Sequence, residues 1–195
     1  MPPTKLILAS SSPRRAEILT NAGLSFSVLS SAVDETPLPS EAPEDLVLRL
    51  ANAKAELVVA RAVGPAIVIG ADTTVVCEGK TLNKPESRDE ARTMLQLLSG
   101  RTHSVLTGVA LIRLPDNARR QFTESTLVQF RPIPEDELNS YLASGESFDK
   151  AGGYAIQGLA GRFIPRIEGC YFNVVGLPLA HLLTELRSLG WSENS

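Results

Sequence analysis

The sequence predicts an α/β fold built on a mixed β-sheet, and two observations support this prediction. Segments of strand character alternate with segments of helical periodicity along all 195 residues, without an internal repeat or a low-complexity linker. Helices connect some strands and short turns connect others, so parallel and antiparallel pairs are both expected. A chain of this length buries roughly 70% of its unfolded surface. We therefore expect a single domain over residues 1–195, or a single body with two lobes around a cleft.

The first elements are marked by their boundary residues. Residues 5–9 form an apolar strand, after which Ser12 is the expected N-cap and Pro13 the first helical residue. Residues 25–31 predict a second strand. Apolar residues at helical spacing after Pro43 predict a long helix.

The rest of the chain continues the alternation. Residues 66–77 are a strongly apolar strand segment interrupted at Asp72, and a hairpin turn is expected around Gly79. Residues 87–90, Ser-Arg-Asp-Glu, have the form of a capping box for a helix that ends at Gly100. The remaining expected elements are a central strand at 103–114, a strand at 125–131, a helix at 134–145, a glycine-rich stretch at 151–169, a closing strand, and a last helix from Pro178.

Composition excludes several classes of protein. A net charge of −3 argues against a protein that wraps nucleic acid, which would carry a basic face. The two cysteines, Cys77 and Cys170, form no CxxC motif, and with no secretory signal they indicate a reducing, cytoplasmic setting. The sequence contains no apolar run of about 18 residues, so no membrane span is expected.

Two arginines stand at the start of the first helix, where the helix macrodipole favours acidic residues instead. Arg14 and Arg15, with the preceding serines and the backbone N–H groups, could bind a phosphate. A capped surface helix with two solvated arginines is the alternative from this turn alone.

Two acidic positions are candidates for catalysis. Apolar residues flank Asp72 on both sides, and a buried carboxylate needs a cation, a metal or hydrogen-bond donors. The alternative is an exposed turn at residues 70–72. Glu35 lies in a proline-rich loop, where a solvated acid is the simpler interpretation. Together the two carboxylates would permit metal binding and base catalysis.

Three further polar residues are ambiguous from sequence. Lys54 borders the apolar stripe of its helix, where a lysine commonly extends its ammonium into water. Pro85 restrains Lys84 to an extended backbone that could direct its side chain into a cleft. Gln157 could read a nucleobase edge or satisfy the backbone of its own glycine-rich loop.

Taken together, these segments resemble the Maf family of nucleoside triphosphate pyrophosphatases. The resemblance covers roughly residues 5 to 190 and rests on several segments that occur in family order. They are LILASSSPRRAEIL, VDETP, LANAKA, IGADTTV, NKP, LSGRTHSVLTGVAL, AGGYAIQG and GCYFNVVGLPL.

The resemblance implies an elongated, curved mixed sheet with flanking helices, in two lobes around a nucleotide cleft. It also implies hydrolysis of a nucleoside triphosphate to the monophosphate and pyrophosphate with a divalent cation, Mg²⁺ or Mn²⁺. Homodimers are common in the family. Asp72 matches the family's proton acceptor, and the residues matching other cleft positions are Ser10, Arg15, Glu35, Lys54 and Lys84.

Three matched positions separate the subfamilies. Arg14, Thr73 and Gln157 are the combination found in members that act on dTTP and UTP. Members that prefer 7-methyl-GTP carry an aromatic residue in place of Arg14. The alternatives are hydrolysis of a purine triphosphate, or a nucleotide-binding regulator of cell division that does not hydrolyse.

The resemblance leads to a mechanistic hypothesis. Glu35 would hold part of the metal, and Asp72 would deprotonate the attacking water or serve as a second metal ligand. Lys54, Lys84 and Arg15 would stabilise the charge that develops on pyrophosphate.

Overall fold

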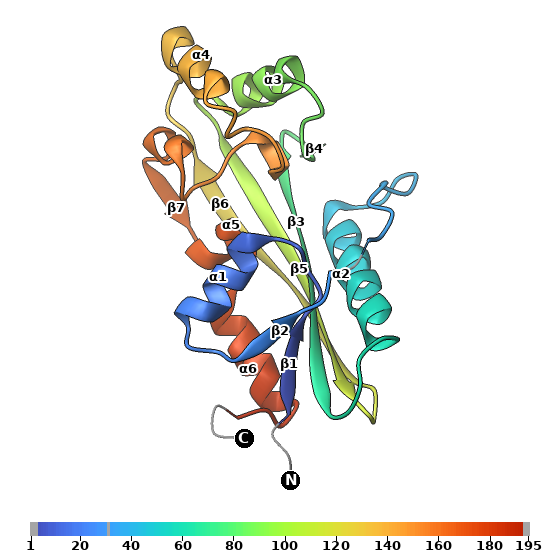
Figure 1. Cartoon of the computed structure of the whole chain (residues 1–195). Helices are drawn as coiled ribbons and strands as arrows, with labels where there is room; N and C mark the ends of the chain where they lie inside the picture. Colours follow the sequence, from blue (N-terminus) through green and yellow to red (C-terminus); the bar gives the residue numbers. More distant parts are fainter. Residues whose placement is uncertain (1–3, 31, 193–195) are drawn as a thin grey trace. The chain divides into compact units, whose positions relative to one another are not determined.

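The computed structural model describes residues 4–30 and 32–192 (Figure 1). Its strands hydrogen-bond in the order β2-β1-β3-β5-β6-β7, and β4 pairs with β3. The elements are β1 (Lys5–Leu8), α1 (Pro13–Asn21), β2 (Phe26–Val28), α2 (Pro43–Val59), β3 (Ala66–Cys77), β4 (Lys80–Leu82), α3 (Arg88–Leu98), β5 (Thr102–Leu114), β6 (Ala118–Gln129), α4 (Glu135–Ala143), η1 (Ala151–Gly153), η2 (Leu159–Phe163), β7 (Arg166–Glu168), α5 (Tyr171–Val175) and α6 (Leu179–Ser188).

The sheet is mixed, as the sequence predicts. Strand β1 pairs in parallel with both β2 and β3, whereas the β3–β4 and β6–β7 pairs are antiparallel. The β3–β4 turn is the expected hairpin, since Glu78 and Gly79 have the positive φ angles of 50° and 72° that a tight two-residue turn requires. Strand β5 lies between β3 and β6 in the sheet, which confirms its central position.

The chain forms two compact units. Unit 1 contains the described residues up to Asp72 together with 107–124 and those from Gly176 onward, and unit 2 contains 73–106 and 125–175. The division falls within β3, β5 and β6, so each of these strands contributes to both units. Asp72 is the last residue of β3 that belongs to unit 1.

In unit 1, α2 packs directly on the strands. A Cβ atom at Gly70 of β3 would lie 2.1 Å from the carbonyl oxygen of Ala51, and one at Gly108 of β5 would lie 2.5 Å from that of Val47. Only glycine allows this approach. Ala51, Ala55 and Val58 of α2 are fully buried, and Lys54 lies on this same inward face of the helix, directed toward β3.

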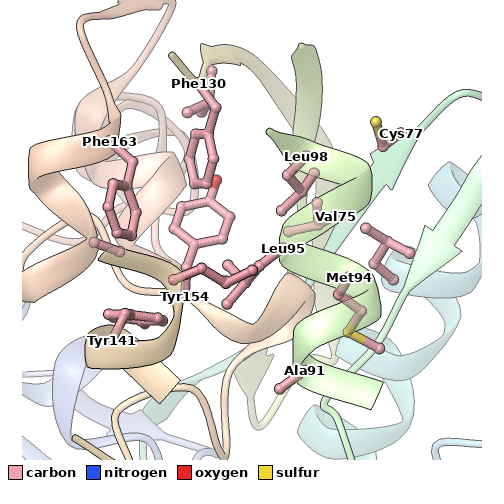
Figure 2. Packing of buried hydrophobic residues seen from close by; sticks show 14 of the residues in the cluster. Val75, Cys77, Ala91, Met94, Leu95, Leu98, Phe130, Tyr141, Tyr154 and Phe163 are labelled. Carbon is pink, nitrogen blue, oxygen red and sulfur yellow. The ribbon is translucent and has the colours of Figure 1, made fainter. Parts of the chain in front are cut away.

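Unit 2 has an aromatic core (Figure 2). The ring of Tyr154 lies edge-on to Phe130 with centroids 4.9 Å apart, and Leu95 and Leu98 of α3 are among the aliphatic residues of the same cluster. Helix α3 begins as expected, because the Ser87 side chain accepts a hydrogen bond from the backbone N–H of Glu90. This core supports the glycine-rich segment that carries Gln157.

Several expected elements differ from the structure. Strand β3 has the expected bounds of 66–77 and is continuous through Asp72, so the alternative of an exposed turn at residues 70–72 is wrong. The second strand is limited to Phe26–Val28, and β6 begins at Ala118 rather than near residue 125. The expected closing strand is helix α5, and the strand of that region, β7, lies within the glycine-rich stretch.

The conformation of α5 has a tertiary cause. The buried side-chain amide of Asn173 donates to the carbonyl oxygen of Val105 at 3.0 Å and to the hydroxyl of Thr126 at 2.9 Å. The backbone N–H of Cys170 also donates to the Thr126 hydroxyl. These contacts override the strand preference of the flanking valines.

Candidate active site

Lys54 links two carboxylates in unit 1. Its ammonium Nζ donates to Oδ1 of Asp72 at 2.6 Å and to Oε1 of Glu35 at 2.7 Å. The lysine side chain is only 9% exposed and that of Asp72 13%, whereas the Glu35 side chain is 44% exposed. The lysine is therefore ion-paired beneath the surface rather than solvated, which rules out the snorkelling alternative.

Arg15 is the second buried cation of unit 1. Its Nε donates to the carbonyl oxygen of Gly176 at 2.8 Å and its Nη1 to the hydroxyl of Ser10 at 3.1 Å. Burial lowers the pKa of Arg15, and the positive charge of Arg14 lowers it further. The negative charges of Asp72 and Glu35 act in the opposite direction and raise this pKa. Asp72 and Glu35 therefore favour the charged form of the Arg15 guanidinium, against its burial.

Helix α1 presents both arginines in a first turn that contains no acidic residue. Ser12 is the N-cap residue, as expected, but its side chain makes no capping bond; its backbone N–H donates to the Ser10 hydroxyl instead. Arg14 is half-buried. Two cations at the positive end of a helix oppose the macrodipole, so an anion bound at this end would stabilise the arrangement.

The loop that carries Glu35 is fixed by an arginine that the sequence reading did not identify. Arg49 of α2 donates from Nε and Nη2 to the two carboxylate oxygens of Glu41, at 2.6 and 2.8 Å. Its Nη2 also donates to the carbonyl oxygen of Thr36 at 3.2 Å. The bond from Arg49 lowers the pKa of Glu41 to about 2, so the carboxylate is ionised at neutral pH. The only local signal was a basic residue eight positions after an acidic one.

Asn83, which precedes Lys84, bonds to two other segments of unit 2. The hydroxyl of Thr74, next to Thr73, donates to Oδ1 of Asn83 at 3.3 Å. The backbone N–H of Gly152 donates to the Asn83 carbonyl at 3.1 Å. Lys84 follows Asn83 and is exposed, as is Gln157 farther along the glycine-rich segment. The contacts are non-local, so sequence reasoning missed Asn83.

The carboxylates of Glu35 and Asp72 fit a hard divalent cation. Mg²⁺ is usually held by one or two carboxylates together with water and substrate phosphates rather than by a full protein cage. The described residues contain no group of three or more His, Cys, Asp or Glu side chains that could hold a metal. Two oxygen donors beside two buried cations therefore fit a cation that enters with a polyphosphate.

Chemically, unit 1 combines two buried cations, the largely buried carboxylate of Asp72 and the more exposed carboxylate of Glu35. Such a set can neutralise phosphate charge and accept a proton from water within one small region.

No helix among the described residues is long and apolar enough to span a bilayer.

The chain is similar to known proteins over nearly its whole length. The model of the family described as Maf-like protein matches residues 5–189. A dTTP/UTP pyrophosphatase of Syntrophus aciditrophicus is 48% identical over 95% of this chain and 90% of its own. Proteins with the same name from Carboxydothermus hydrogenoformans and Geobacillus sp. are 48% and 49% identical over 96% of this chain, with 100% and 99% of their own lengths covered.

A solved structure of a dITP/XTP pyrophosphatase from Mycobacterium abscessus is 16% identical, with a TM-score of 0.42 over 95% of this chain and 98% of its own, which is too distant to support an argument. The family match spans every segment on which the sequence resemblance rests. The chain therefore belongs to the Maf-like protein family.

Proposed function

We propose that this protein hydrolyses dTTP and UTP to the nucleoside monophosphate and pyrophosphate. The observation that carries the proposal is the buried Lys54 ammonium, which is bonded to both Glu35 and Asp72. Relatives near 48% identity over nearly the full chain are named for this activity.

In the proposed reaction, a water oxygen attacks the α-phosphorus and the bond from that phosphorus to the bridging oxygen breaks. Asp72 accepts the proton that the water loses, and pyrophosphate leaves with the electron pair of the broken bond. Asp72 is suited to this role because its side chain is only 13% exposed and Lys54 fixes the orientation of its carboxylate.

The cations would stabilise the charge that develops on the leaving group. Arg15 is oriented by Ser10 and by the carbonyl of Gly176, so little reorganisation is needed when a phosphate arrives. Lys54 lies between the carboxylates, and Lys84 would add a third positive charge. Glu35, with Asp72, would hold Mg²⁺ or Mn²⁺, which when bound supplies charge neutralisation on phosphate oxygens.

Substrate choice would rest on Arg14, Thr73 and Gln157. All three positions carry the residues of the dTTP- and UTP-hydrolysing members, and the names of the relatives agree with that assignment. A purine triphosphate is the competing substrate class. A regulator that binds without hydrolysing is disfavoured by the presence of Asp72 with its ion-paired lysine.

We further propose a cytoplasmic enzyme that acts on free nucleotides rather than on nucleic acid. The two cysteines are free thiols, consistent with a reducing compartment. The family resemblance favours a homodimer, which light scattering of the purified protein would test.

The experiment is a panel of nucleoside triphosphates assayed for pyrophosphate release with Mg²⁺, with Mn²⁺ and with EDTA. We expect dTTP and UTP to be cleaved fastest and EDTA to abolish cleavage. Gln157→Glu serves as the specificity variant and should lower the preference for these two substrates. Preference of the unaltered protein for a purine would overturn the substrate assignment. Absence of cleavage for all nucleotides would overturn the enzyme assignment.

A further inference from the structure

Gln157 lies in a tight turn of unit 2. The backbone N–H of Gly158 donates to the carbonyl oxygen of Ala155 at 3.2 Å, which closes the turn around Ile156 and Gln157. The short helix η2 follows at once, so the turn lies between two ordered segments. The side chain of Gln157 is exposed, and its position depends on what holds the turn.

The carboxylate of Glu146 is bonded to this turn. Its Oε2 accepts a hydrogen bond from the backbone N–H of Leu159 at 2.9 Å. Its Oε1 lies 3.4 Å from the hydroxyl of Tyr141, which also donates to the carbonyl oxygen of Gly153 at 3.2 Å. Glu146 and Tyr141 together hold the glycine-rich segment on either side of Gln157.

Gly158 lies against the same carboxylate. A Cβ atom at position 158 would lie 2.2 Å from Oε1 of Glu146. The φ angle there is −104°, outside the left-handed region that favours glycine. A side chain at position 158 would therefore displace the Glu146 carboxylate from its present position.

We propose that Glu146 is a positioning residue for substrate selection, acting through the turn that presents Gln157. The proposal rests on the proposed function, in which Gln157 contacts the base. A carboxylate that accepts a hydrogen bond from a backbone N–H forms a strong, charge-assisted bond. Here that bond joins Glu146 to the backbone of Leu159, two residues after Gln157. Loss of this bond frees Gln157 while the phosphate-binding residues of unit 1 are untouched.

The first test is the kinetics of Glu146→Ala with dTTP, UTP and dATP. We expect KM for dTTP to rise about tenfold while kcat stays within about twofold, because base contacts weaken and the reacting groups are unchanged. The preference for dTTP over dATP should fall by about tenfold. Glu146→Gln retains an oxygen acceptor for Leu159 and should restore most of both values.

The matched control is Glu168→Ala, which removes an exposed carboxylate from β7 of the same unit. It should leave KM and the substrate preference unchanged. Unaltered substrate preference in Glu146→Ala, or equal changes in Glu146→Ala and Glu168→Ala, would overturn the proposal.

Gly158→Ala gives a second test that does not depend on the stability of Glu146→Ala. Alone, it should displace the carboxylate and reproduce the loss of preference. In the Glu146→Ala background the space is free, so adding Gly158→Ala should change the preference by less than about twofold. Additive effects of the two substitutions would contradict the proposed contact.

Hydrogen exchange tests the bond from Leu159 to Glu146 directly, and the cleavage assays separate this inference from the proposed function. The Leu159 amide should exchange faster in Glu146→Ala than in the unaltered protein. If the unaltered protein cleaves dTTP and the variants keep their preference, the positioning role alone fails. If the unaltered protein cleaves no nucleotide, the proposed function fails and the selection role fails with it.

Discussion

The two units differ in the kind of polar group that each one buries. Among the described residues, the buried charged side chains are Arg15 and Lys54, and both belong to unit 1. The buried polar side chains of unit 2 are uncharged at neutral pH: Thr74, His103, Thr126, Ser147 and Asn173. Burial lowers the pKa of His103 to about 4, so this imidazole is neutral at pH 7.

This difference matches two separate tasks. A buried cation is costly unless an anion lies beside it, and in unit 1 Asp72 and Glu35 supply that anion. A polyphosphate can supply it as well. In unit 2 the hydrogen bonds instead fix backbone, as Tyr141 does at Gly153. The buried charges of unit 1 thus suit the phosphates of the proposed substrate, whereas the neutral polar groups of unit 2 fix its backbone.

Asp72→Asn should have the largest effect on the chemistry assigned to unit 1. The substitution keeps the shape of the side chain and removes the base, so kcat for dTTP should fall by about 10³-fold. Lys54 keeps Glu35 as a partner, so the melting temperature should change little. Turnover above a tenth of the original rate would remove Asp72 from the proton-accepting role.

Lys54→Met should come next. It retains the length of the side chain but leaves two carboxylates without their shared cation, so kcat/KM should fall by about 10²-fold. Chemical denaturation should also show a loss of about 1–3 kcal/mol, reduced from the value for a fully buried pair because Glu35 is partly exposed. The control is Lys80→Met, at an exposed lysine of β4. Equal losses in the two variants would contradict a special role for Lys54.

Arg49→Gln should have a smaller effect, transmitted through the loop that carries Glu35. Losing the paired bonds to Glu41 and the bond to Thr36 should misplace Glu35 and reduce kcat by about tenfold. Arg119→Gln removes a surface pair with Glu56 in the same unit and should leave kcat unchanged. A requirement for more Mg²⁺ in Arg49→Gln alone would sharpen the assignment of Glu35 as a metal ligand.

His103 should have the smallest effect on catalysis and a visible effect on stability. Its folded pKa of about 4 lies below the ordinary 6.5. Between these values the unfolded chain binds a proton that the folded chain does not. The contribution of His103 to the free energy of unfolding is therefore fully present above pH 6.5. It declines as the pH falls toward 4, by up to about 3 kcal/mol.

The measurement is the free energy of unfolding from urea titrations at pH 7 and pH 5, in the original protein and in His103→Gln. The variant should lose most of this pH dependence. An unchanged slope in His103→Gln would show that unit 2 does not bury a neutral imidazole.

The sequence predicted most of the fold because its signals are local. Pro43, Ser87 and the Glu78–Gly79 turn act through neighbouring residues, and each begins or ends an element where expected. Helix α5 was missed because its conformation depends on a hydrogen bond from Asn173 to a distant strand. Strand β3 has the predicted bounds, because the apolar residues on both sides of Asp72 outweigh the low strand propensity of aspartate, and Lys54 is the partner that the buried carboxylate needs.

The candidate site was predicted only in part, because some of its residues act through distant partners. Arg15, Glu35, Lys54 and Asp72 could be named from the family resemblance, and the contacts of Lys54 bring three of them together. Arg49, Asn83 and Glu146 act through partners far away or through backbone groups, which leave no pattern in a single sequence.

The most direct test of the central claim is hydrolysis of dTTP in water enriched in ¹⁸O, with mass analysis of both products. Attack at the α-phosphorus predicts that the label appears in the nucleoside monophosphate and that pyrophosphate is unlabelled. Label in the pyrophosphate, or release of inorganic phosphate with a nucleoside diphosphate, would contradict the proposed reaction.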